Sequence, residues 1–320
     1  MIIPIIYPSA GDFWLHLDTE LLTKNSIINW GHTGLPPDQP FGVTAEDVRR
    51  VTKCLDLKLP LYLISPHENY KRKGNCCVIR AQTVPFSADS FIHLTYDTYD
   101  IYIACPELCF LQAARFLDII DLVEFGYELC ATYRLDPSNQ FGVTNREPLT
   151  STERIKTFLD NNHSLYGAAK ARKALRYVRD LSNSPIETQL AMFSNLSSKY
   201  GGCQMIKIKM NPLIKLNKEG IRLTGKSHLR GDLMLFDRLV VDYNSNAAHL
   251  KPEQYSVDMD RKTAINMAGY DYVTLTYGNI KDYHSMMDSI NSLRFFFHME
   301  PLEPDNDARR DLYYRIFKDI

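Results

Sequence analysis

The sequence has no long hydrophobic run, no basic leader and almost no net charge, and each absence excludes a class of protein. No stretch approaches the roughly 18 to 20 apolar residues that cross a bilayer, so we expect no membrane partner. The apolar start of the chain lacks a basic segment, which argues against a secretory signal peptide. The formal net charge is −1, so any nucleic-acid binding has to come from local clusters of charge.

The cysteines indicate a reduced chain. There are seven, an odd number, and none forms a CxxC pair. Cys105 and Cys109 lie one helical turn apart, a spacing that suits metal ligation but is more often plain core packing. Free thiols and the missing signal peptide together predict a cytoplasmic protein.

The first half of the chain predicts a mixed α+β domain. With 320 residues, 45% of them hydrophobic and 23% charged, the chain can form two globular domains. Residues 44–57 and 105–133 have helical spacing, whereas residues 60–103 alternate as strands do. We therefore expect an N-terminal α+β domain over residues 1–150 that regulates the rest or recognises a partner.

A polar, turn-rich segment over 136–154 leads into a predicted helical linker over 151–181. Its second helix is basic and contains Arg172 and Arg176, which are candidate nucleic-acid contacts.

Residues 182–297 predict an α/β domain, followed by a helical tail over 298–320. The order is a helix capped by Ser184, three or four strands, a helix and a last strand. The expected strands are 205–210, 221–224, 229–243 with a turn at Asp237-Arg238, and 272–277; the expected later helices are 256–268 and 282–296. A helix separates the last two core strands, so that pair should be parallel within a mixed sheet.

Three acids in this domain suit a divalent cation. Glu187 opens the first helix, Asp232 starts a strand and Asp242 ends the next one. Because Mg²⁺ prefers hard oxygen ligands, convergent carboxylates are enough to bind it, and the bound ion can drive phosphodiester hydrolysis. The sequence therefore predicts a site for Mg²⁺ or Mn²⁺ formed by these three residues.

Structural alternatives exist for each residue. Glu187 also fits the S-x-x-E capping box, Asp232 can be a turn residue, and Asp242 can simply end a strand. His249 can activate water or lie in a loop, and Arg261 can contact phosphate or pair with a nearby aspartate.

Basic residues are concentrated between Lys199 and Arg230, where eight of them accompany the single acid Glu219. They are a nucleic-acid surface or a solvated strand face. The candidate nucleic-acid contacts in this domain are Lys207, Lys209, Lys226, Arg230 and Arg261.

The order of these residues resembles the PD-(D/E)XK, restriction-endonuclease-like superfamily, and within it the very-short-patch-repair-like domains. The resemblance covers about 180–296 and rests on Glu187, Asp232, Asp242, His249, Arg261 and the G-Y-x-Y-V run at 269–273. It implies an αβββαβ core and a Mg²⁺-dependent phosphodiesterase activity on DNA. Asn244 stands where the superfamily has its lysine, so Asn244 itself, His249, Lys226 or Arg261 would have to act in its place, or activity is lost.

A second resemblance covers more of the chain. The stretches ISPHENYKRKGNCCVIRAQTVP and DIYIACPELCFLQAARFLDIIDLVEFGYELCATYRLDP are similar to AbiEi-like type IV antitoxins. This resemblance implies phage defence or a toxin–antitoxin system, with a toxin or another defence component as protein partner. Residues 1–60 show no winged helix-turn-helix of the kind such antitoxins carry.

Three functions are compatible with the sequence. The first is a metal-dependent DNA endonuclease-like protein, and the alternative is a non-catalytic nucleic-acid-binding antitoxin or regulator that retains a nuclease fold. A pure protein-interaction module is a third reading, in which the basic surface has no nucleic-acid role.

Overall fold

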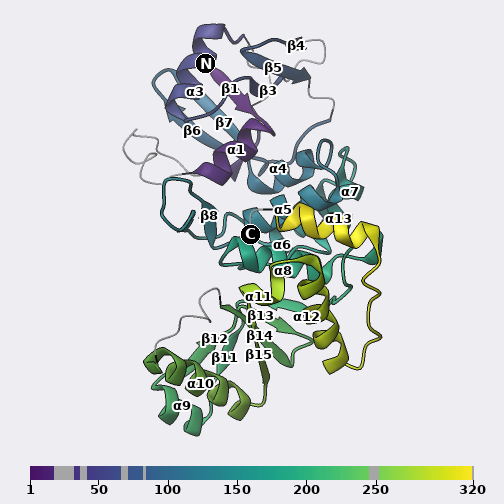
Figure 1. Cartoon of the computed structure of the whole chain (residues 1–320). Coiled ribbons are helices and arrows are strands. Elements are labelled where there is room, and N and C mark those ends of the chain that lie inside the picture. The colour runs from purple at the N-terminus through teal and green to yellow at the C-terminus, as the bar shows by residue number, and fades with distance from the viewer. Residues whose placement is uncertain (18–31, 37–41, 66–70, 82–83, 245–251, 319–320) are drawn as a thin grey trace. The chain divides into compact units, whose positions relative to one another are not determined.

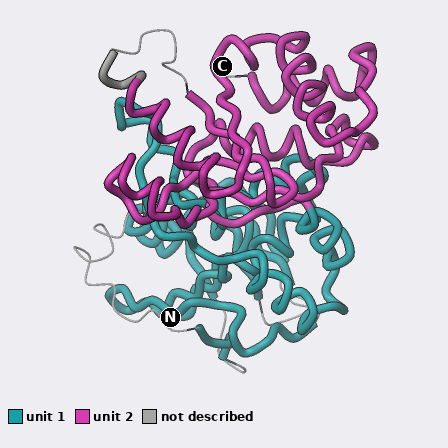
Figure 2. The backbone as a smooth tube through the Cα atoms, turned by 90° about the horizontal axis from the view of Figure 1, so that it is seen from below, with its two compact units in different colours: residues 1–176 teal, residues 177–320 magenta. Residues whose placement is uncertain are grey.

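The chain forms two compact units. The computed structural model describes residues 1–17, 32–36, 42–65, 71–81, 84–244 and 252–318. Unit 1 contains Met1–Arg176 and unit 2 contains Tyr177–Ile320 (Figure 2). Both units combine helices with sheets, which confirms the α/β class.

Unit 1 is built on a seven-stranded mixed sheet with the order β2-β6-β7-β1-β3-β5-β4 (Figure 1). Its strands are β1 Ile2–Ile5, β2 His32–Thr33, β3 Leu61–Ser65, β4 Arg72–Lys73, β5 Cys77–Ala81, β6 Phe91–Tyr96 and β7 Tyr99–Ala104. The pairs β1–β7 and β3–β5 are parallel, and the other pairs are antiparallel. The central strands are largely buried, β1 along its whole length, and Ile3, Leu63 and Ile101 have no exposed surface, as in a sheet that is covered on both faces.

Several of the helices described in unit 1 begin at capping residues that the sequence shows. They are α1 Ser9–His16, α3 Ala45–Cys54, α4 Pro106–Ala113, α5 Ile119–Cys130, α6 Thr152–Asn161 and α7 Ala168–Leu175. Thr44 caps α3 through a complete capping box with Asp47, and Pro106 occupies the first turn of α4. The hairpin β8 Tyr133–Leu135 and β9 Val143–Asn145 lies near the expected turn-rich segment. The basic segment expected in a linker lies in unit 1 as α7, which packs on α5 and α6.

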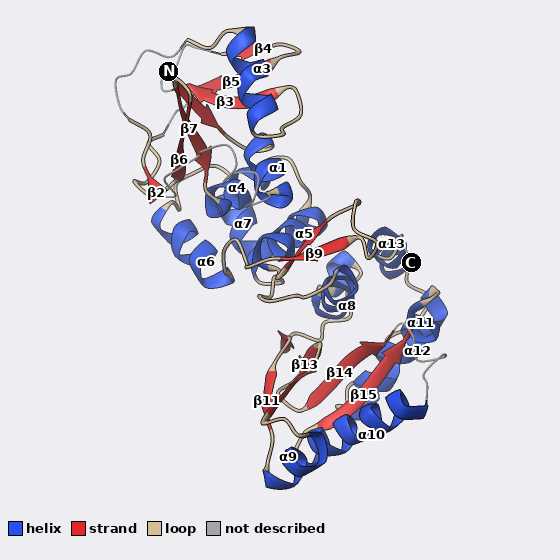
Figure 3. Cartoon of the chain, turned by 90° about the vertical axis from the view of Figure 1, so that its left-hand side faces the viewer, coloured by secondary structure: helices blue, strands red, loops and turns tan. Residues whose placement is uncertain are grey.

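Unit 2 contains a four-stranded sheet with the order β10-β13-β14-β15 (Figure 3). Its elements are α8 Pro185–Asn195, a 3₁₀ turn at Ser198–Tyr200, β10 Ile208–Met210, β11 Leu213–Lys215, α9 Lys218–Thr224, β12 His228–Arg230, β13 Leu233–Leu235, β14 Leu239–Asn244, α10 Pro252–Met267, β15 Asp271–Thr276, α11 Tyr277–Ile280, α12 Tyr283–Phe296 and α13 Asp307–Ile316. The pairs β10–β13 and β13–β14 are antiparallel, whereas β14–β15 is parallel with α10 between them in the chain. The predicted parallel pair is therefore confirmed.

One predicted strand is wrong. Residues 221–224 belong to the helix α9, not to a strand. The side chain of Asn217 accepts a hydrogen bond from the Gly220 N–H at the start of α9, and Gly225 ends the helix with a φ of 70°. These two end signals outweigh the short alternation of Ile221 and Leu223, because a capped turn satisfies the backbone locally.

A hydrophobic core joins α10 to one face of the unit 2 sheet. Val240 of β14 and Met234 of β13 pack with Ala264 and Ile265 of α10, and Ile214 of β11 completes the contact. Asp242 is two residues after Val240, and alternate residues of a strand point to the same face. This packing directs Asp242 toward α10.

The cysteines and the membrane-spanning potential of the helices can be read directly from the structure. All seven cysteines are free, and Cys105 and Cys109 are buried in the core. No helix in the described part of the chain is both long and apolar enough to span a membrane.

Candidate functional site

Glu187 is buried at the start of α8 and belongs to the helix cap. Only 6% of the residue is exposed. Ser184 Oγ donates to Glu187 Oε1 at 3.0 Å, while the Asn183 N–H donates to Oε2 at 3.0 Å. Asn211 Nδ2 donates to the same Oε2 at 2.6 Å. The carboxylate therefore contacts the residues at the start of the helix without the complete capping box that α3 has, and it also reaches a residue 24 positions away.

Asp232, which directly precedes β13, and Asp242 of β14 are held together by hydrogen bonds from backbone N–H groups to their carboxylates. The Asp232 N–H donates to Asp242 Oδ1 at 3.1 Å, and the Tyr243 N–H donates to Asp232 Oδ2 at 2.7 Å. The chain comes close to β14 here, since a Cβ on Gly231 would lie 2.4 Å from Val240 Cγ1. Glycine at 231 is thus what allows Asp232 to sit beside Asp242.

Asp242 is paired with a cation from α10. Arg261 Nε and Nη2 both lie 2.8 Å from Asp242 Oδ2, and the Tyr272 hydroxyl donates to the same oxygen at 2.8 Å. Arg261 also donates to the backbone oxygen of Arg230. The local ion pair expected for Arg261 as an alternative is therefore present, but with Asp242 and not with an acid on its own helix.

Asn211 connects Glu187 with Asp232, and it was not among the site residues predicted from the sequence. Its side chain contacts Glu187, while its backbone N–H donates to the Asp232 carbonyl at 2.8 Å. Asn211 has a positive φ of 44°, a conformation that asparagine tolerates better than most residues. An asparagine directly before Pro212 is a turn signal that could have drawn attention to this position.

Burial raises the pKa values of two of the acids. The pKa of Glu187 rises from its ordinary 4.5 to about 7, chiefly through burial and in addition through the charge of Asp232. The pKa of Asp232 rises from 3.8 to about 6, again chiefly through burial and also through the charge of Asp242. Both carboxyls thus carry a cost of ionisation that a bound cation would relieve.

The pKa values of the Asp242 partners move in the directions expected for a stable ion pair. Burial alone would lower the pKa of Arg261, but the charge of Asp242, its hydrogen bond to Arg261 and the contribution of Tyr272 together outweigh burial and hold that pKa above its ordinary value. The pKa of Tyr272 is raised to about 12, first by burial and then by the charge of Asp242. Tyr272 therefore stays protonated and acts as a hydrogen-bond donor at neutral pH.

The fit to a cation differs among the three acids. Asp242 Oδ2 already accepts hydrogen bonds from Arg261 and Tyr272, so it is a poor metal ligand in this arrangement. Asp232 Oδ1 has no hydrogen-bond partner among the described residues, and Glu187 Oε1 accepts one hydrogen bond and keeps a lone pair. No group of three His, Cys, Asp or Glu side chains within the described ranges is arranged to hold a metal ion. Glu187 and Asp232 are therefore the two carboxylates with an oxygen left to accept a cation, and Mg²⁺ commonly takes one or two carboxylates from a protein.

The remaining catalytic candidates lie around this site or outside the described residues. Asn244 is the last residue of β14 and stands two positions after Asp242, on the same face of the strand. His249 lies outside the described residues.

The candidate nucleic-acid contacts lie in both units. The eight basic residues between Lys199 and Arg230 are all exposed. Lys209 pairs with Asp237, and Arg172 of unit 1 pairs with Asp160 at 3.3 Å. Arg176 is the last residue of unit 1. No charged partner among the described residues contacts the side chains of Lys207, Lys226 and Arg230, which leaves them available to phosphate.

We compared the chain with protein-family models, curated proteins and solved structures. None of them matches. The resemblances to nuclease-like domains and to antitoxins therefore rest on the residues quoted for them, and the function has to be inferred from the site itself.

Proposed function

We propose that unit 2 is a metal-dependent, endonuclease-like domain that acts on DNA, with Glu187 and Asp232 binding the cation. The observation that carries this proposal is the coupling of the buried Glu187 carboxylate with the partly buried Asp232 carboxylate. Both have a raised pKa, and no cationic side chain is among the groups that shift the pKa of Glu187. A buried acid without a cation is costly, and a divalent ion supplies the missing charge.

The order of the secondary-structure elements supports the same proposal. Helix α8, the antiparallel strands β10, β13 and β14, helix α10 and the parallel strand β15 come in the order of the αβββαβ core of PD-(D/E)XK nucleases, with β11, α9 and β12 inserted between β10 and β13. A bound divalent cation would lower the pKa of a water molecule and neutralise charge on a scissile phosphate. In this proposal Asp242 is a positioning residue, because it accepts the Asp232 N–H and is itself held by Arg261.

The second candidate is a non-catalytic nucleic-acid-binding protein that retains this core. Two observations favour it: Asp242 already has a cation from the protein, and Asn244 replaces the lysine of the superfamily pattern. Asparagine can bind water but cannot stabilise a developing hydroxide by charge. The setting of phage defence or toxin–antitoxin function is supported only by the resemblance of the first half of the chain to AbiEi-like antitoxins.

Cleavage of supercoiled plasmid and of single-stranded DNA tests the two candidates. The reactions contain Mg²⁺, Mn²⁺ or EDTA, and compare the native protein with Asp232→Asn and with Asp288→Asn, which changes an exposed acid of α12. Metal-dependent nicking that Asp232→Asn loses and Asp288→Asn keeps supports the nuclease. Salt-sensitive DNA binding without any nicking supports the second candidate, whereas neither binding nor nicking contradicts both.

A further inference from the structure

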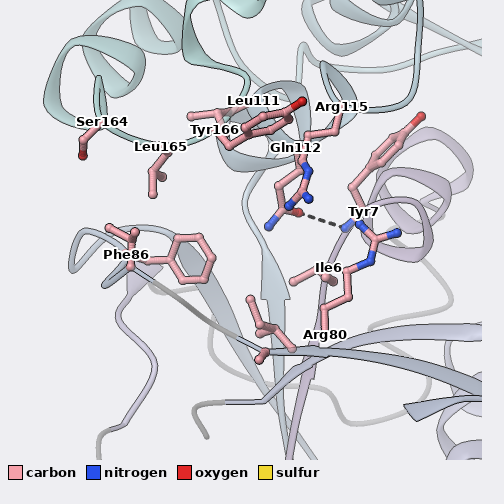
Figure 4. A pocket seen from close by; sticks show the side chains of 13 residues that line it. Ile6, Tyr7, Arg80, Phe86, Leu111, Gln112, Arg115, Ser164, Leu165 and Tyr166 are labelled. Carbon is pink, nitrogen blue, oxygen red and sulfur yellow. Dashed lines mark hydrogen bonds between the residues drawn. The ribbon is translucent and has the colours of Figure 1, made fainter. Parts of the chain in front are cut away.

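Unit 1 contains a cavity of about 210 Å³ that the proposed nuclease site does not use. Figure 4 shows its lining, which comes from the segment after β1, from β3 and β5, from α4 and from the loop between α6 and α7. The apolar part of the wall includes Ile6, Ile64 and Leu111, each no more than 6% exposed. Phe86 and Leu165 also line it. This wall is suited to the flat, weakly polar face of a ligand.

Two arginines, Arg80 of β5 and Arg115 just after α4, line the same cavity. Neither forms an ion pair with a carboxylate of the described residues. Each guanidinium instead lies over an aromatic ring: Arg80 Cζ is 4.4 Å from the centroid of Phe116, and Arg115 Cζ is 4.8 Å from that of Tyr166. Stacking of this kind holds the guanidinium plane and leaves its in-plane N–H groups free to bind an acceptor.

The two charges repel each other. The pKa of Arg80 is lowered, first by burial and then by the charge of Arg115. Like charges placed in one cavity raise the free energy of the unliganded protein, and an anion between them would remove that cost. The pair of arginines is therefore better explained as an anion site than as a contribution to folding.

Gln112 adds a polar group beside the arginines. Its Oε1 accepts a hydrogen bond from the Tyr7 backbone N–H at 3.0 Å, which fixes the orientation of the amide (Figure 4). The amide nitrogen of Gln112, Nε2, donates to no acceptor among the described residues. A fixed donor of this kind is what recognises a ring nitrogen or a carbonyl oxygen of a base.

We propose that this cavity binds a nucleoside phosphate. Arg80 and Arg115 hold the phosphate, because two guanidinium forks match its oxygens and its charge. The apolar wall and Phe86 contact the base, and Gln112 donates a hydrogen bond to it. The site lies within unit 1, so it is independent of the nuclease proposal for unit 2.

Isothermal titration calorimetry of the full chain with AMP, GMP, CMP and UMP tests this proposal. The same nucleosides without phosphate, and inorganic phosphate alone, are titrated alongside. We expect saturable binding of at least one nucleotide, and a dissociation constant about tenfold or more higher for its nucleoside and for inorganic phosphate.

Arg80→Gln and Arg115→Gln should each weaken nucleotide binding about tenfold or more, while Arg49→Gln, a change at an exposed arginine of α3, should leave it unaltered. Tryptophan fluorescence, to which the buried Trp14 contributes, shows whether each variant is folded. Arg115 is exposed, so its replacement leaves the core of unit 1 unchanged. The proposal is overturned if no nucleotide binds saturably, if a nucleoside or inorganic phosphate binds as tightly as the nucleotide, or if the folded Arg115→Gln variant binds as the native chain does.

Discussion

Arg261 and Asp242 form a largely buried ion pair between α10 and β14. The Arg261 side chain is 27% exposed and that of Asp242 is 10% exposed, and their closest atoms are 2.8 Å apart. Asp242, which its position in the sequence makes a candidate metal ligand, is thus paired with the guanidinium of Arg261. Because of this pair, our proposal makes Asp242 a positioning residue and leaves Glu187 and Asp232 as the cation ligands. Substitution of Arg261 tests the contribution of the pair to stability.

Replacing Arg261 by Gln should destabilise unit 2 by about 2 kcal/mol, because Asp242 would be left partly buried without its cation. The double variant Arg261→Gln/Asp242→Asn should regain part of the loss, since it leaves no uncompensated charge. Unit 2 has no tryptophan, so hydrogen exchange of its peptides in urea is the suitable measurement. Arg222→Gln, at an exposed residue of α9, is the control, and equal protection in both single variants would contradict the role of the pair.

The stability of unit 2 should fall as the pH rises from about 5 to about 7.5. The folded-state pKa of Glu187 is about 7 and that of Asp232 is about 6, both above their ordinary values, so the folded state binds more protons in this range. Stability is therefore greatest below the ordinary pKa and is lost as the acids ionise in the folded state, by on the order of 2 kcal/mol.

The variant Glu187→Gln tests this pH dependence. It cannot ionise, so its stability should change less between pH 5 and pH 7.5, as measured by the same hydrogen-exchange method. If Glu187 and Asp232 bind Mg²⁺, adding the metal at pH 7.5 should stabilise the native protein and not this variant. If the stability of the native protein is constant between pH 5 and pH 7.5, ionisation of Glu187 and Asp232 does not destabilise the folded state, and the prediction is wrong.

Replacing Asn244 by Lys should increase metal-dependent nicking by about tenfold or more. A lysine two residues after Asp242 would place a positive charge on the face of β14 that carries the acid, where it can stabilise a developing hydroxide. Plasmid nicking in Mn²⁺ measures the effect, and Asn244→Gln controls for the change of side-chain size. If Asn244→Lys binds metal and DNA but nicks no faster than the native chain, the missing lysine is not what limits this site.

The exposed basic residues of unit 2 should govern the salt dependence of DNA binding. Changing Lys207, Lys226 and Arg230 to Gln should lower the slope of log K against log salt by nearly one for each phosphate contact that is lost. Fluorescence anisotropy at several salt concentrations gives this slope. A control with the same change of charge replaces the exposed Lys53, Lys58 and Lys281, and an equal effect of both sets would indicate non-specific attraction only.

The sequence by itself determined the local structure. Ser184 caps α8, Thr44 caps α3, and the turn after β13 contains Asp237, because these features depend on hydrogen bonds and backbone preferences of neighbouring residues. The wrong strand prediction at 221–224 has the same origin, because the Asn217 cap and Gly225 determine the local structure there and a short alternation of apolar residues does not.

Tertiary structure alone decided which side chains meet. The contact of Asn211 with Glu187 spans 24 positions, that of Arg261 with Asp242 spans 19, and Arg80 and Arg115 line one cavity from a strand and the end of a helix. Such contacts depend on strand order and on the packing of helices against the sheet, which hydrophobic periodicity does not specify. The sequence thus supplied three acids in a suitable order, and the packing of α10 on β14 paired Asp242 with Arg261, so our proposal places the cation on Glu187 and Asp232.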